Sequence, residues 1–544
     1  MFFYDNKNRI YQKELTFIRK KYISLKEINS IRHKRKSIKY IIKQILLLNV
    51  KELKAIFIIT NIRHYKKRYN KKYYLSKLKD NQDLFDNILG YPLDLEQRKA
   101  IINDEQNLLI LAGAGSGKTL TMVGKVLYLL NQGIKSNEIL VISFTNASVK
   151  SFIDKVRKSN VNVDVFTFHK LGLKIIKNAG IKVRISEDNV LESIMCKYNI
   201  NKQNKKVIES FIHLFKSKNL PFSMFDLYLK KTAKNKEKNQ FIKTIKKIYF
   251  EYNDYLIKKQ LIDFDDMINL AYEQVDNNSF VSKYKYILVD EYQDTSLIKF
   301  KLLKKILNIS NSKLIVVGDD WQSIYRFTGC ELNLFLDFKK NLEFSDIVSI
   351  NNTYRNSQEL IDIASNFITK NPCQLKKEIK SNKRLRTPIN IVLYNDVNIA
   401  LIYCIDKLIE QYNKPKIMII GRNNNDILML DGKKFKIINN VIFYKDIEIK
   451  YITAHKSKGL EEDNVIIINL ENKITGFPSK ILNHDILSLI SNDREDFVFD
   501  EERRLFYVAL TRTKNYVYLL APIKAPSLFV EELIKYKSVN IIKV

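Results

Sequence analysis

Residues 112–119 read AGAGSGKT, and this stretch decides the fold of the chain around it. The apolar residues 108–111 come directly before it and predict a buried strand. Apolar residues recur at spacings of three and four from Val123 to Leu130, which predicts a helix directly after it. A glycine-rich loop between a strand and a helix lets backbone N–H groups surround phosphate oxygens. The alternative, a glycine-rich turn with an incidental lysine, fits these flanking elements poorly.

The loop therefore predicts a nucleotide-binding site. Its members are Ala112, Gly113, Ala114, Gly115, Ser116, Gly117, Lys118 and Thr119. Lys118 is expected to reach the β- and γ-phosphates, and the Thr119 hydroxyl to hold Mg²⁺. Ala112 stands where a glycine is more usual. A nucleotide site does not by itself name a function.

Composition limits the class of protein. The 544-residue chain carries 93 Lys and Arg against 59 Asp and Glu, a formal charge of +34. Its length suffices for about three or four domains. Such basicity favours a polyanionic partner, with nucleic acid first. Abundant Ile, Asn, Tyr and Phe are also typical of an AT-rich genome, which raises lysine content without any polyanion, so charge alone leaves both interpretations open.

Cysteine usage and the N-terminus predict a cytoplasmic protein. The four cysteines are too far apart in sequence for a zinc or iron–sulfur motif, and free thiols suit a reducing compartment. The first residues form no signal peptide, and the apolar stretches 46–50 and 55–59 are too short to span a bilayer. We therefore expect a soluble protein with no membrane partner.

Alternating strands and helices predict an α/β fold with two doubly wound parallel sheets. The first sheet is expected to contain the strands 108–111, 139–143, 163–166, 286–289 and 314–317. A second block is expected from about Cys330, with the strands 347–350, 389–393, 417–420, 465–470 and 516–520 and the helices 358–368 and 399–412. The predicted organisation is an N-terminal region 1–90, a first domain 91–176 and 263–329, a lysine-rich helical insertion 177–262, and a second domain 330–544.

Residues 1–90 form a basic region that is expected to be helical. Isoleucines recur at helical spacing, and tyrosines interleave with Lys and Arg; these residues are Ile38, Ile41, Ile42, Ile45, Tyr65, Tyr69, Tyr73 and Tyr74. Aromatic rings among cations can stack on bases while the charges hold phosphates. A small helical domain with a solvated basic face is the alternative, and the two interpretations are compatible.

Asp290 and Glu291 end the apolar run 286–289 and complete the expected nucleotide site. Asp290 would hold Mg²⁺ together with Thr119, and Glu291 would orient and deprotonate the attacking water. An acidic pair at the end of a strand is a weak signal alone. Downstream of a phosphate loop it is a strong one and predicts nucleotide hydrolysis.

The run DEYQDTS at 290–296 resembles the Walker B motif of the UvrD/Rep/PcrA-type DNA helicases of superfamily 1. Other stretches resemble that family's motifs in order: LEQRKA at 95–100, VISFTNASVKSF at 141–152, TFH at 167–169, DFDDMINLA at 263–271, VGDDWQSIYRFTG at 317–329, TYR at 353–355, ITAHKSKGL at 452–460 and ERRLFYVALTRTK at 502–514. The resemblance spans roughly 93–520. The Asp-Asp-Trp-Gln run, NPCQLKK at 371–377 and EERRLFY at 501–507 resemble the helicase IV branch most.

The resemblance implies two RecA-like domains that bind ATP and Mg²⁺ between them, and an ATP-dependent 3′–5′ DNA helicase acting in repair, recombination or replication. It implies that Gln97 reads the adenine and Tyr354 stacks on it. Gln322 would sense the γ-phosphate and link it to DNA. Arg355 and Arg512 resemble the family's two arginine fingers, which stabilise negative charge on the γ-phosphate.

The resemblance also implies contacts to single-stranded DNA and to duplex junctions. The residues at matching positions are Phe144, Thr145, His169, Tyr325, Phe327 and His455. The aromatic ones would stack on bases, and Thr145 and His169 would hold phosphates. Core packing is the alternative for each aromatic residue alone. Metal binding by His169 or His455 is disfavoured because no partner lies at ligand spacing.

Two departures from the family pattern affect the predicted function. Leu120 stands where many members place an arginine that clamps the base. The large helical 2B subdomain of UvrD, Rep and PcrA is missing or reduced at about 423–450, where Asp431-Gly432 predicts the turn of a small hairpin. Two alternatives therefore stay open: an RNA polymerase-associated ATPase of the helicase IV-like type, and a translocase that displaces proteins with little unwinding. Repair or transcription proteins would be further partners of this chain.

Overall fold

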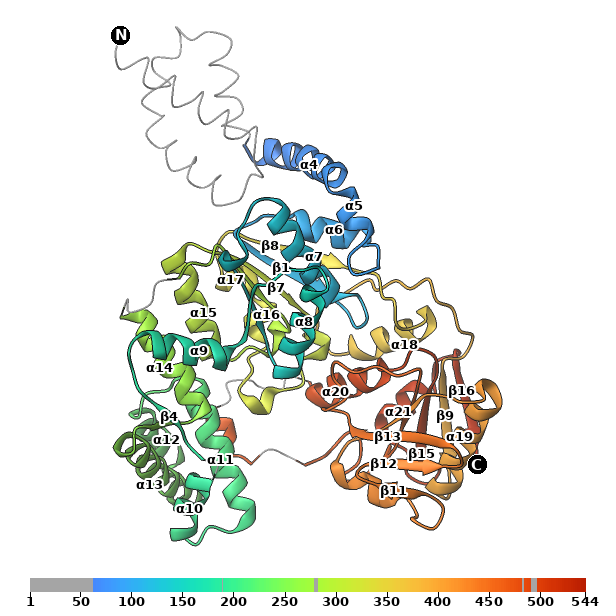
Figure 1. The fold of residues 1–544 in the computed structure, drawn as a ribbon. Helices are drawn as coiled ribbons and strands as arrows, with labels where there is room; N and C mark the ends of the chain where they lie inside the picture. Colours follow the sequence, from blue (N-terminus) through green and yellow to red (C-terminus); the bar gives the residue numbers. More distant parts are fainter. Residues whose placement is uncertain (1–61, 188, 278–281, 482–483, 491–496) are drawn as a thin grey trace, which may run out of the picture.

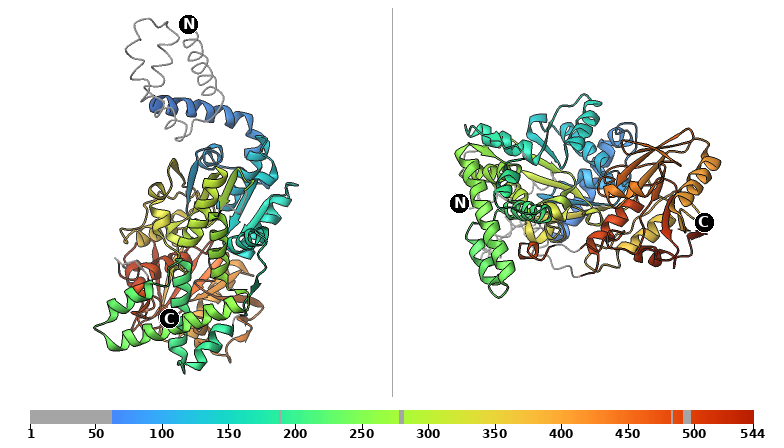
Figure 2. Two further views of the ribbon diagram at one scale, coloured as in Figure 1. Left: turned by 90° about the vertical axis from the view of Figure 1, so that its left-hand side faces the viewer. Right: turned by 90° about the horizontal axis from the view of Figure 1, so that it is seen from below.

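The computed structural model describes residues 62–187, 189–277, 282–481, 484–490 and 497–544. Two sheets with covering helices form two α/β domains, and a helical insertion lies beside the first (Figure 1). Figure 2 shows the same parts from the side and from below, with the N-terminal helix α4 at the end of the molecule away from the insertion. This arrangement confirms the predicted fold class. Across the described ranges, every helix is too short or too polar to cross a membrane.

The first domain is built on a six-stranded parallel sheet of order β3-β2-β6-β7-β1-β8. Its strands are β1 (Asn107–Ala112), β2 (Ile139–Ser143), β3 (Asp164–Thr167), β6 (Tyr286–Val289), β7 (Lys313–Gly318) and β8 (Ser345–Ile350). Successive side chains of a strand point to opposite faces of the sheet. Leu108 and Leu109 of β1 accordingly lie in two different hydrophobic cores, one on each face. Both faces of this sheet are therefore covered by helices.

One face packs against the helices α9 (Phe168–Asn178), α14 (Phe264–Asp276), α15 (Leu297–Ser310), α16 (Asn333–Leu336) and α17 (Phe338–Asn341). The other face packs against α6 (Leu95–Ile102), α7 (Lys118–Asn131) and α8 (Asn146–Arg157). Because all strands are parallel, their carboxyl ends meet at one edge of the sheet. The phosphate loop and the acidic pair both lie at that edge.

The strand that we predicted at 347–350 lies in the first sheet and does not open the second. β8 pairs with β1 in parallel, with Ile347 opposite Leu109. Local alternation of apolar residues predicts a strand but carries no information about its neighbour in space, so this assignment was wrong. We therefore propose that the first domain extends to Ile350, beyond the predicted boundary at 329.

The N-terminal helices α4 (Ile62–Asp80) and α5 (Gln82–Asp86) pack against the first domain. Tyr73 and Tyr74 lie against its core, and the Tyr74 hydroxyl donates to the Leu95 carbonyl over 3.2 Å. Phe85 and Ile88 are fully buried in the same core. These contacts favour packing over base stacking for the two tyrosines. The predictions for residues 1–61, including Ile38, Ile41, Ile42 and Ile45, lie outside the described residues.

The helical insertion has its own core. It contains β4 (Arg184–Ile185), α10 (Asn189–Lys197), α11 (Lys202–Ser217), α12 (Met224–Thr232), α13 (Lys236–Lys258) and β5 (Leu261–Ile262). The buried Lys216 ammonium attaches α11 to the first domain, because it lies 2.6 Å from an Asp263 oxygen and 2.8 Å from an Asp266 oxygen. Asp263 also caps the N-terminus of α14. The DFDD motif thus joins the insertion to the first domain.

The second domain contains an eight-stranded sheet of order β11-β12-β13-β10-β14-β15-β9-β16. Its strands are β9 (Ile389–Tyr394), β10 (Ile417–Gly421), β11 (Lys436–Ile438), β12 (Val441–Tyr444), β13 (Ile447–Thr453), β14 (Asn464–Ile467), β15 (Val517–Pro522) and β16 (Val539–Lys543). Its helices are α18 (Gln358–Ile368), α19 (Val397–Tyr412), α20 (Asp500–Leu510) and α21 (Leu528–Leu533). All pairs from β13 to β16 are parallel, and β11-β12-β13 are antiparallel.

A small hairpin occupies the region expected for a reduced 2B insertion, but its turn differs from the predicted one. β11 and β12 are joined by Asn439 and Asn440, whose φ values are 49° and 63°. Two consecutive left-handed residues match a tight hairpin turn, and asparagine tolerates this conformation better than most residues. Asp431 and Gly432 lie in the loop before β11.

Residues 484–490, which we call the bridging segment, belong to the second half of the chain but pack on the helical insertion (Figure 1). Ile486 and Ile490 are 1% and 2% exposed and lie in the core of the insertion. Asp485 lies 2.8 Å from the Lys238 ammonium of α13, and the His484 ring contacts Phe241. The insertion therefore contacts the first domain and also a segment from between β14 and α20.

Placing a carboxylate in this apolar contact should release the bridging segment. We expect Ile486→Asp to destabilise its docking by about 3 kcal/mol, because a buried unpaired charge is costly. Limited proteolysis should then cleave near residues 484–490 faster than in the wild-type protein. Ile481→Asp is the matched control, since Ile481 is 64% exposed. Equal cleavage rates for the wild type and both variants would contradict the importance of this contact.

Candidate nucleotide and nucleic-acid site

The predicted phosphate loop joins β1 to α7 at the carboxyl edge of the first sheet. Gly117 precedes α7 with φ 79°, and no side chain caps the helix, so its first N–H groups are available to an anion. Gly115 has φ 70°, and a Cβ there would lie 2.6 Å from Arg355 Cβ. The loop is therefore closely covered by the chain that follows β8.

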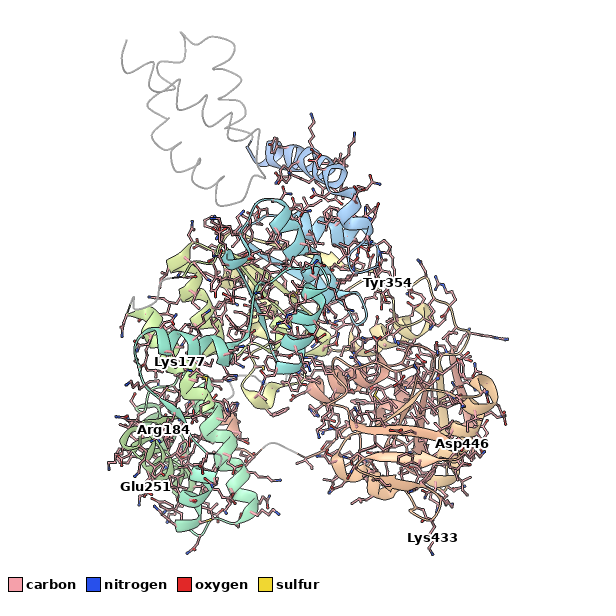
Figure 3. All side chains as sticks on the ribbon, in the orientation of Figure 1. Lys177, Arg184, Glu251, Tyr354, Lys433 and Asp446 are labelled. Atoms are coloured by element: carbon pink, nitrogen blue, oxygen red, sulfur yellow. The ribbon has the colours of Figure 1, made fainter. Side chains whose placement is uncertain are left out.

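Gln97 lies behind the loop. Its side-chain N–H donates to the Ser116 carbonyl over 3.1 Å, and its side-chain oxygen accepts from the Asp94 N–H over 2.9 Å. Tyr354 is exposed on the outer surface between the two α/β domains, and its hydroxyl donates to Asp94 over 2.8 Å (Figure 3). The structure thus brings both residues predicted to contact adenine to the same acid at the start of α6.

Asp290 and Glu291 follow β6 and face the loop. Glu291 adopts a left-handed conformation with φ 49°, and one of its oxygens lies 4.0 Å from the Lys118 ammonium. Burial acts to raise the pKa of the Glu291 carboxyl, but Lys118 and Lys458 outweigh it and hold that pKa well below its usual range. Burial and the Glu291 charge raise the pKa of Asp290. Glu291 is thus an ionised carboxylate next to the lysine of the phosphate loop.

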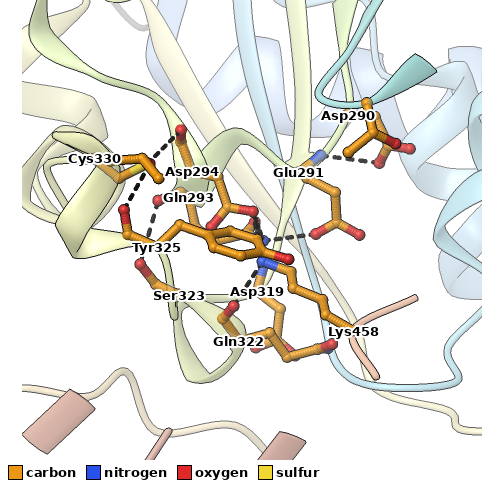
Figure 4. A network of polar contacts seen from close by, with 12 residues as sticks. Asp290, Glu291, Gln293, Asp294, Asp319, Gln322, Ser323, Tyr325, Cys330 and Lys458 are labelled. Carbon is orange, nitrogen blue, oxygen red and sulfur yellow. Dashed lines mark hydrogen bonds and ion pairs between the residues drawn. The ribbon is translucent and has the colours of Figure 1, made fainter. Parts of the chain in front are cut away.

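A chain of hydrogen bonds connects Glu291 to the following strand (Figure 4). The Gln293 amide donates to Glu291 over 2.6 Å, and its oxygen accepts from the Asp319 N–H over 3.0 Å. Asp319 accepts in turn from the Gln322 amide over 2.6 Å. These residues belong to the turns after β6 and β7, so the two strand ends form one polar network.

Both predicted arginine fingers come from the second domain and lie beside this network. Arg512 donates to the Gln322 oxygen over 3.2 Å, and burial together with Arg355 lowers the pKa of Arg512 to about 9. Arg512 therefore stays a cation at neutral pH. Arg355 lies 2.8 Å from Glu461 and donates to the Thr511 carbonyl over 3.3 Å. The structure brings Lys118, Glu291, Gln322 and both arginines to one place.

Four charged residues of this site, Lys458, Asp294, Glu461 and Lys377, were not singled out from the sequence. The buried Lys458 ammonium is paired with Asp294 of the first domain, and it donates to the Gln322 carbonyl over 2.7 Å. Glu461 holds Arg355, and the buried Lys377 is paired with Asp319. Lys458, Asp294 and Glu461 lie within or directly beside stretches that we identified as motifs, which could have marked them. Lys377 ends the stretch NPCQLKK that we compared with the helicase IV branch, but its pairing with Asp319 was not predicted.

The aromatic residues predicted to bind DNA form one cluster across the two domains. Phe144 stacks on Tyr325 with 5.7 Å between centroids, and Phe327 contacts both Tyr325 and His455 edge-on. Phe327 is 58% exposed. Burial, Arg422 and Lys458 lower the pKa of His455 to about 4, so its ring is neutral at neutral pH. These rings are suited to stack on bases without sequence preference.

Two predicted phosphate contacts lie beside this cluster. Thr145 follows Phe144 and caps α8 by accepting from the Ser148 N–H over 3.1 Å. His169 at the start of α9 contacts the exposed ring of Phe264, a residue that we did not predict as a DNA contact. Burial and Lys299 lower the pKa of His169 to about 4, so it would donate to a phosphate as a neutral ring. Lys299 also lies 4.9 Å from the Phe144 ring and adds a cation to this surface.

Comparison with known proteins agrees with this geometry. Residues 93–343 match the UvrD/REP helicase N-terminal domain, and residues 437–522 match the UvrD-like helicase C-terminal domain. DNA helicase IV of Escherichia coli is 29% identical over 510 residues, which cover 85% of this chain and 73% of that protein. ATP-dependent DNA helicase Rep of Buchnera aphidicola (Schizaphis graminum) is 29% identical over 83% of this chain and 73% of its own length.

DNA helicase II of Rickettsia typhi is 27% identical over 83% of this chain and 73% of that protein. The two domain matches together cover more than half of the chain and include the phosphate loop, the acidic pair and Arg512. The chain therefore belongs to the UvrD/Rep family of ATP-dependent DNA helicases.

Proposed function

We propose that this chain moves 3′ to 5′ along single-stranded DNA, driven by ATP hydrolysis, and separates duplex at junctions. The observation that carries this proposal is a single turn after β7. That turn holds Gln322 in the network of the acidic pair and the arginines, and three residues later it holds Tyr325 in the aromatic cluster. A change at the nucleotide therefore has a direct route to the DNA surface.

In this proposal the first domain binds ATP and supplies the base. The loop and the N-terminus of α7 hold the phosphates, and Lys118 neutralises their charge. Glu291 orients and activates water, which its ionised state supports. Arg355 and Arg512 stabilise the negative charge that develops on the γ-phosphate.

The site also suits Mg²⁺, which prefers hard oxygen ligands. Asp290 is a partly buried carboxylate whose pKa is raised by desolvation and by the Glu291 charge, so a cation at this place would relieve an unfavourable negative charge. Thr119, on the first turn of α7, would supply the hydroxyl ligand. When bound, the ion would neutralise charge on the phosphates.

Domain closure is the proposed source of movement. The arginines lie in the second domain and the phosphate loop in the first, so ATP would be held tightest when the two are close. Release of phosphate and ADP would let them separate. Alternating grip of the aromatic cluster would then advance the protein along the strand. The 3′–5′ direction and a role in repair, recombination or replication rest on the family resemblance.

A translocase that displaces proteins and unwinds little is a second candidate. The observation that favours it is the small hairpin of β11 and β12 in place of a large helical subdomain. A short hairpin offers little surface to hold a duplex ahead of the motor.

Replacing the proposed base tests the hydrolysis mechanism. We expect Glu291→Gln to lower the kcat of DNA-stimulated ATP hydrolysis by at least about 100-fold, because general-base catalysis is lost. Lys118→Ala should also abolish hydrolysis, and both variants should still bind single-stranded DNA. Glu448→Gln, a change at an exposed position of β13, is the control. Normal ATP turnover by either site variant would overturn the assignment.

The aromatic cluster is tested by removing its most exposed ring. Phe327→Ala should weaken binding of a single-stranded oligonucleotide by about 1–3 kcal/mol, the usual value of one stacked base. Fluorescence anisotropy with a labelled oligonucleotide measures this loss. Tyr412→Ala removes a partly exposed ring at the end of α19 and should leave affinity unchanged. Equal affinity for Phe327→Ala and the wild type would argue against base stacking there.

Polarity and unwinding are tested together by strand displacement. Duplexes with a 3′ tail should be separated in the presence of ATP, and blunt or 5′-tailed duplexes should not. A preference for the 5′ tail would contradict the proposed direction. Displacement of streptavidin from a biotinylated single strand without duplex separation would favour the protein-displacing translocase.

A further inference from the structure

Lys377 is a buried cation that the proposed hydrolysis mechanism does not use. Its side chain is 4% exposed, and it contacts the carboxylates of Asp319 and Asp320, whose side chains are 0% exposed. The Asp320 contact is 2.5 Å. Two carboxylates fully removed from water are unfavourable unless cations and hydrogen bonds compensate them. The Lys377 ammonium therefore compensates the negative charge of the two buried carboxylates in this turn.

Asp319 is the centre of the polar network at the nucleotide site. Its side chain accepts from the Gln322 amide over 2.6 Å and from the Trp321 N–H over 3.2 Å. Its main-chain N–H donates to Gln293, which in turn contacts the proposed base Glu291. A displacement of Asp319 would thus affect both the proposed base and the proposed γ-phosphate sensor.

The Asp319 carboxylate also decides which way the Gln322 amide points. An ionised carboxylate can only accept hydrogen bonds, so it takes the NH₂ group of the amide. The amide oxygen is then directed to Arg512, 3.2 Å away. Burial would raise the pKa of Asp319, but Lys377 and Lys118 outweigh it and keep that pKa below its ordinary value. The cation and the orientation of the amide are linked through one carboxylate.

Lys377 reaches this turn from the segment that follows α18. In the same segment, the Leu375 carbonyl accepts from the Trp321 ring N–H over 2.9 Å, and the Leu375 N–H donates to Asp320 over 2.8 Å. The ammonium also lies 4.6 Å from the centroid of the Trp321 ring. Three contacts from one short segment therefore hold the turn η4 (Asp320–Gln322) in place.

We infer that Lys377 is a positioning residue for ATP hydrolysis: it fixes the Asp319 carboxylate, and Asp319 presents the Gln322 amide oxygen to Arg512. Lys377 itself touches neither the phosphate loop nor Glu291. This inference rests on the proposed function, because Gln322 and Arg512 matter only if the site hydrolyses ATP. It predicts a defect in turnover, since these groups act on charge that develops during the reaction. ATP binding depends mainly on the loop and Lys118, and should be retained.

The two aspartates provide a matched pair of test variants. Asp319→Asn and Asp320→Asn each remove one buried carboxylate next to Lys377 and keep the side-chain size. If the cluster only supports the fold, the two variants should behave alike. If Lys377 acts through Asp319, Asp319→Asn should lower kcat for DNA-stimulated hydrolysis by about tenfold or more, and Asp320→Asn by less than about threefold.

The experiment compares Lys377→Met, Lys377→Arg and the two aspartate variants in the full-length chain. Lys377→Met should lower kcat by about tenfold or more with a change in the KM for ATP below about threefold, and Lys377→Arg should recover part of the rate. Oligonucleotide-binding stoichiometry gives the folded fraction, so kcat is reported per active molecule. Lys370→Met, which removes a surface lysine paired with Glu532, is the control.

Wild-type kcat in folded Lys377→Met, or equal losses in Asp319→Asn and Asp320→Asn, would overturn the inference. If Lys377→Met fails to fold, the comparison of the two aspartate variants decides the matter alone. The proposed function has a separate outcome. If the wild-type chain shows no DNA-stimulated ATP hydrolysis, the proposed function fails. If the wild type hydrolyses ATP and Glu291→Gln does not, the proposed function stands, whatever the activity of the Lys377 variants.

Discussion

The insertion of Trp321 into the second domain is the contact on which the relation of the two α/β domains depends. Trp321 follows β7 of the first sheet, yet it is fully buried in the core of the second domain, edge-on to Tyr507 at 5.4 Å. Its neighbours Asp319 and Gln322 face the nucleotide site. A large ring buried in one domain thus fixes the position of polar groups that belong to the other.

The charges around this contact are mutually dependent. Lys458, Arg512 and Lys377 are buried, and each lies next to acids or amides of the first domain. Removing one member of such a group leaves an uncompensated charge in a low dielectric, which costs more than the ion pair contributes. The site is therefore best described as one electrostatic unit, formed only when both domains are in place. This fits a motor whose reaction must depend on the distance between them.

Local sequence patterns predicted most elements but not their neighbours. The apolar runs at β2 and β6 matched the observed strands because a strand covered on both faces is apolar throughout. The pairing of β8 with β1 was missed, since no local pattern records which strand lies alongside. The loop, the acidic pair and the arginines were found through their motifs. Lys377 lies in the quoted stretch NPCQLKK, but its role was missed, because a lysine in a polar segment looks exposed until the fold surrounds it with carboxylates.

The bridging segment adds a third contact between the parts of the molecule. The two α/β domains meet at Trp321, the insertion meets the first domain at Lys216, and it meets the second half of the chain through Ile486 and Ile490. The insertion is thus attached to the first domain directly, and to the second half of the chain through residues 484–490. At its edge, the contact of the bridging segment includes the exposed ion pair of Asp485 and Lys238, which contributes little stability. If the α/β domains move as proposed, the contacts of Ile486 and Ile490 would have to accommodate that movement as well.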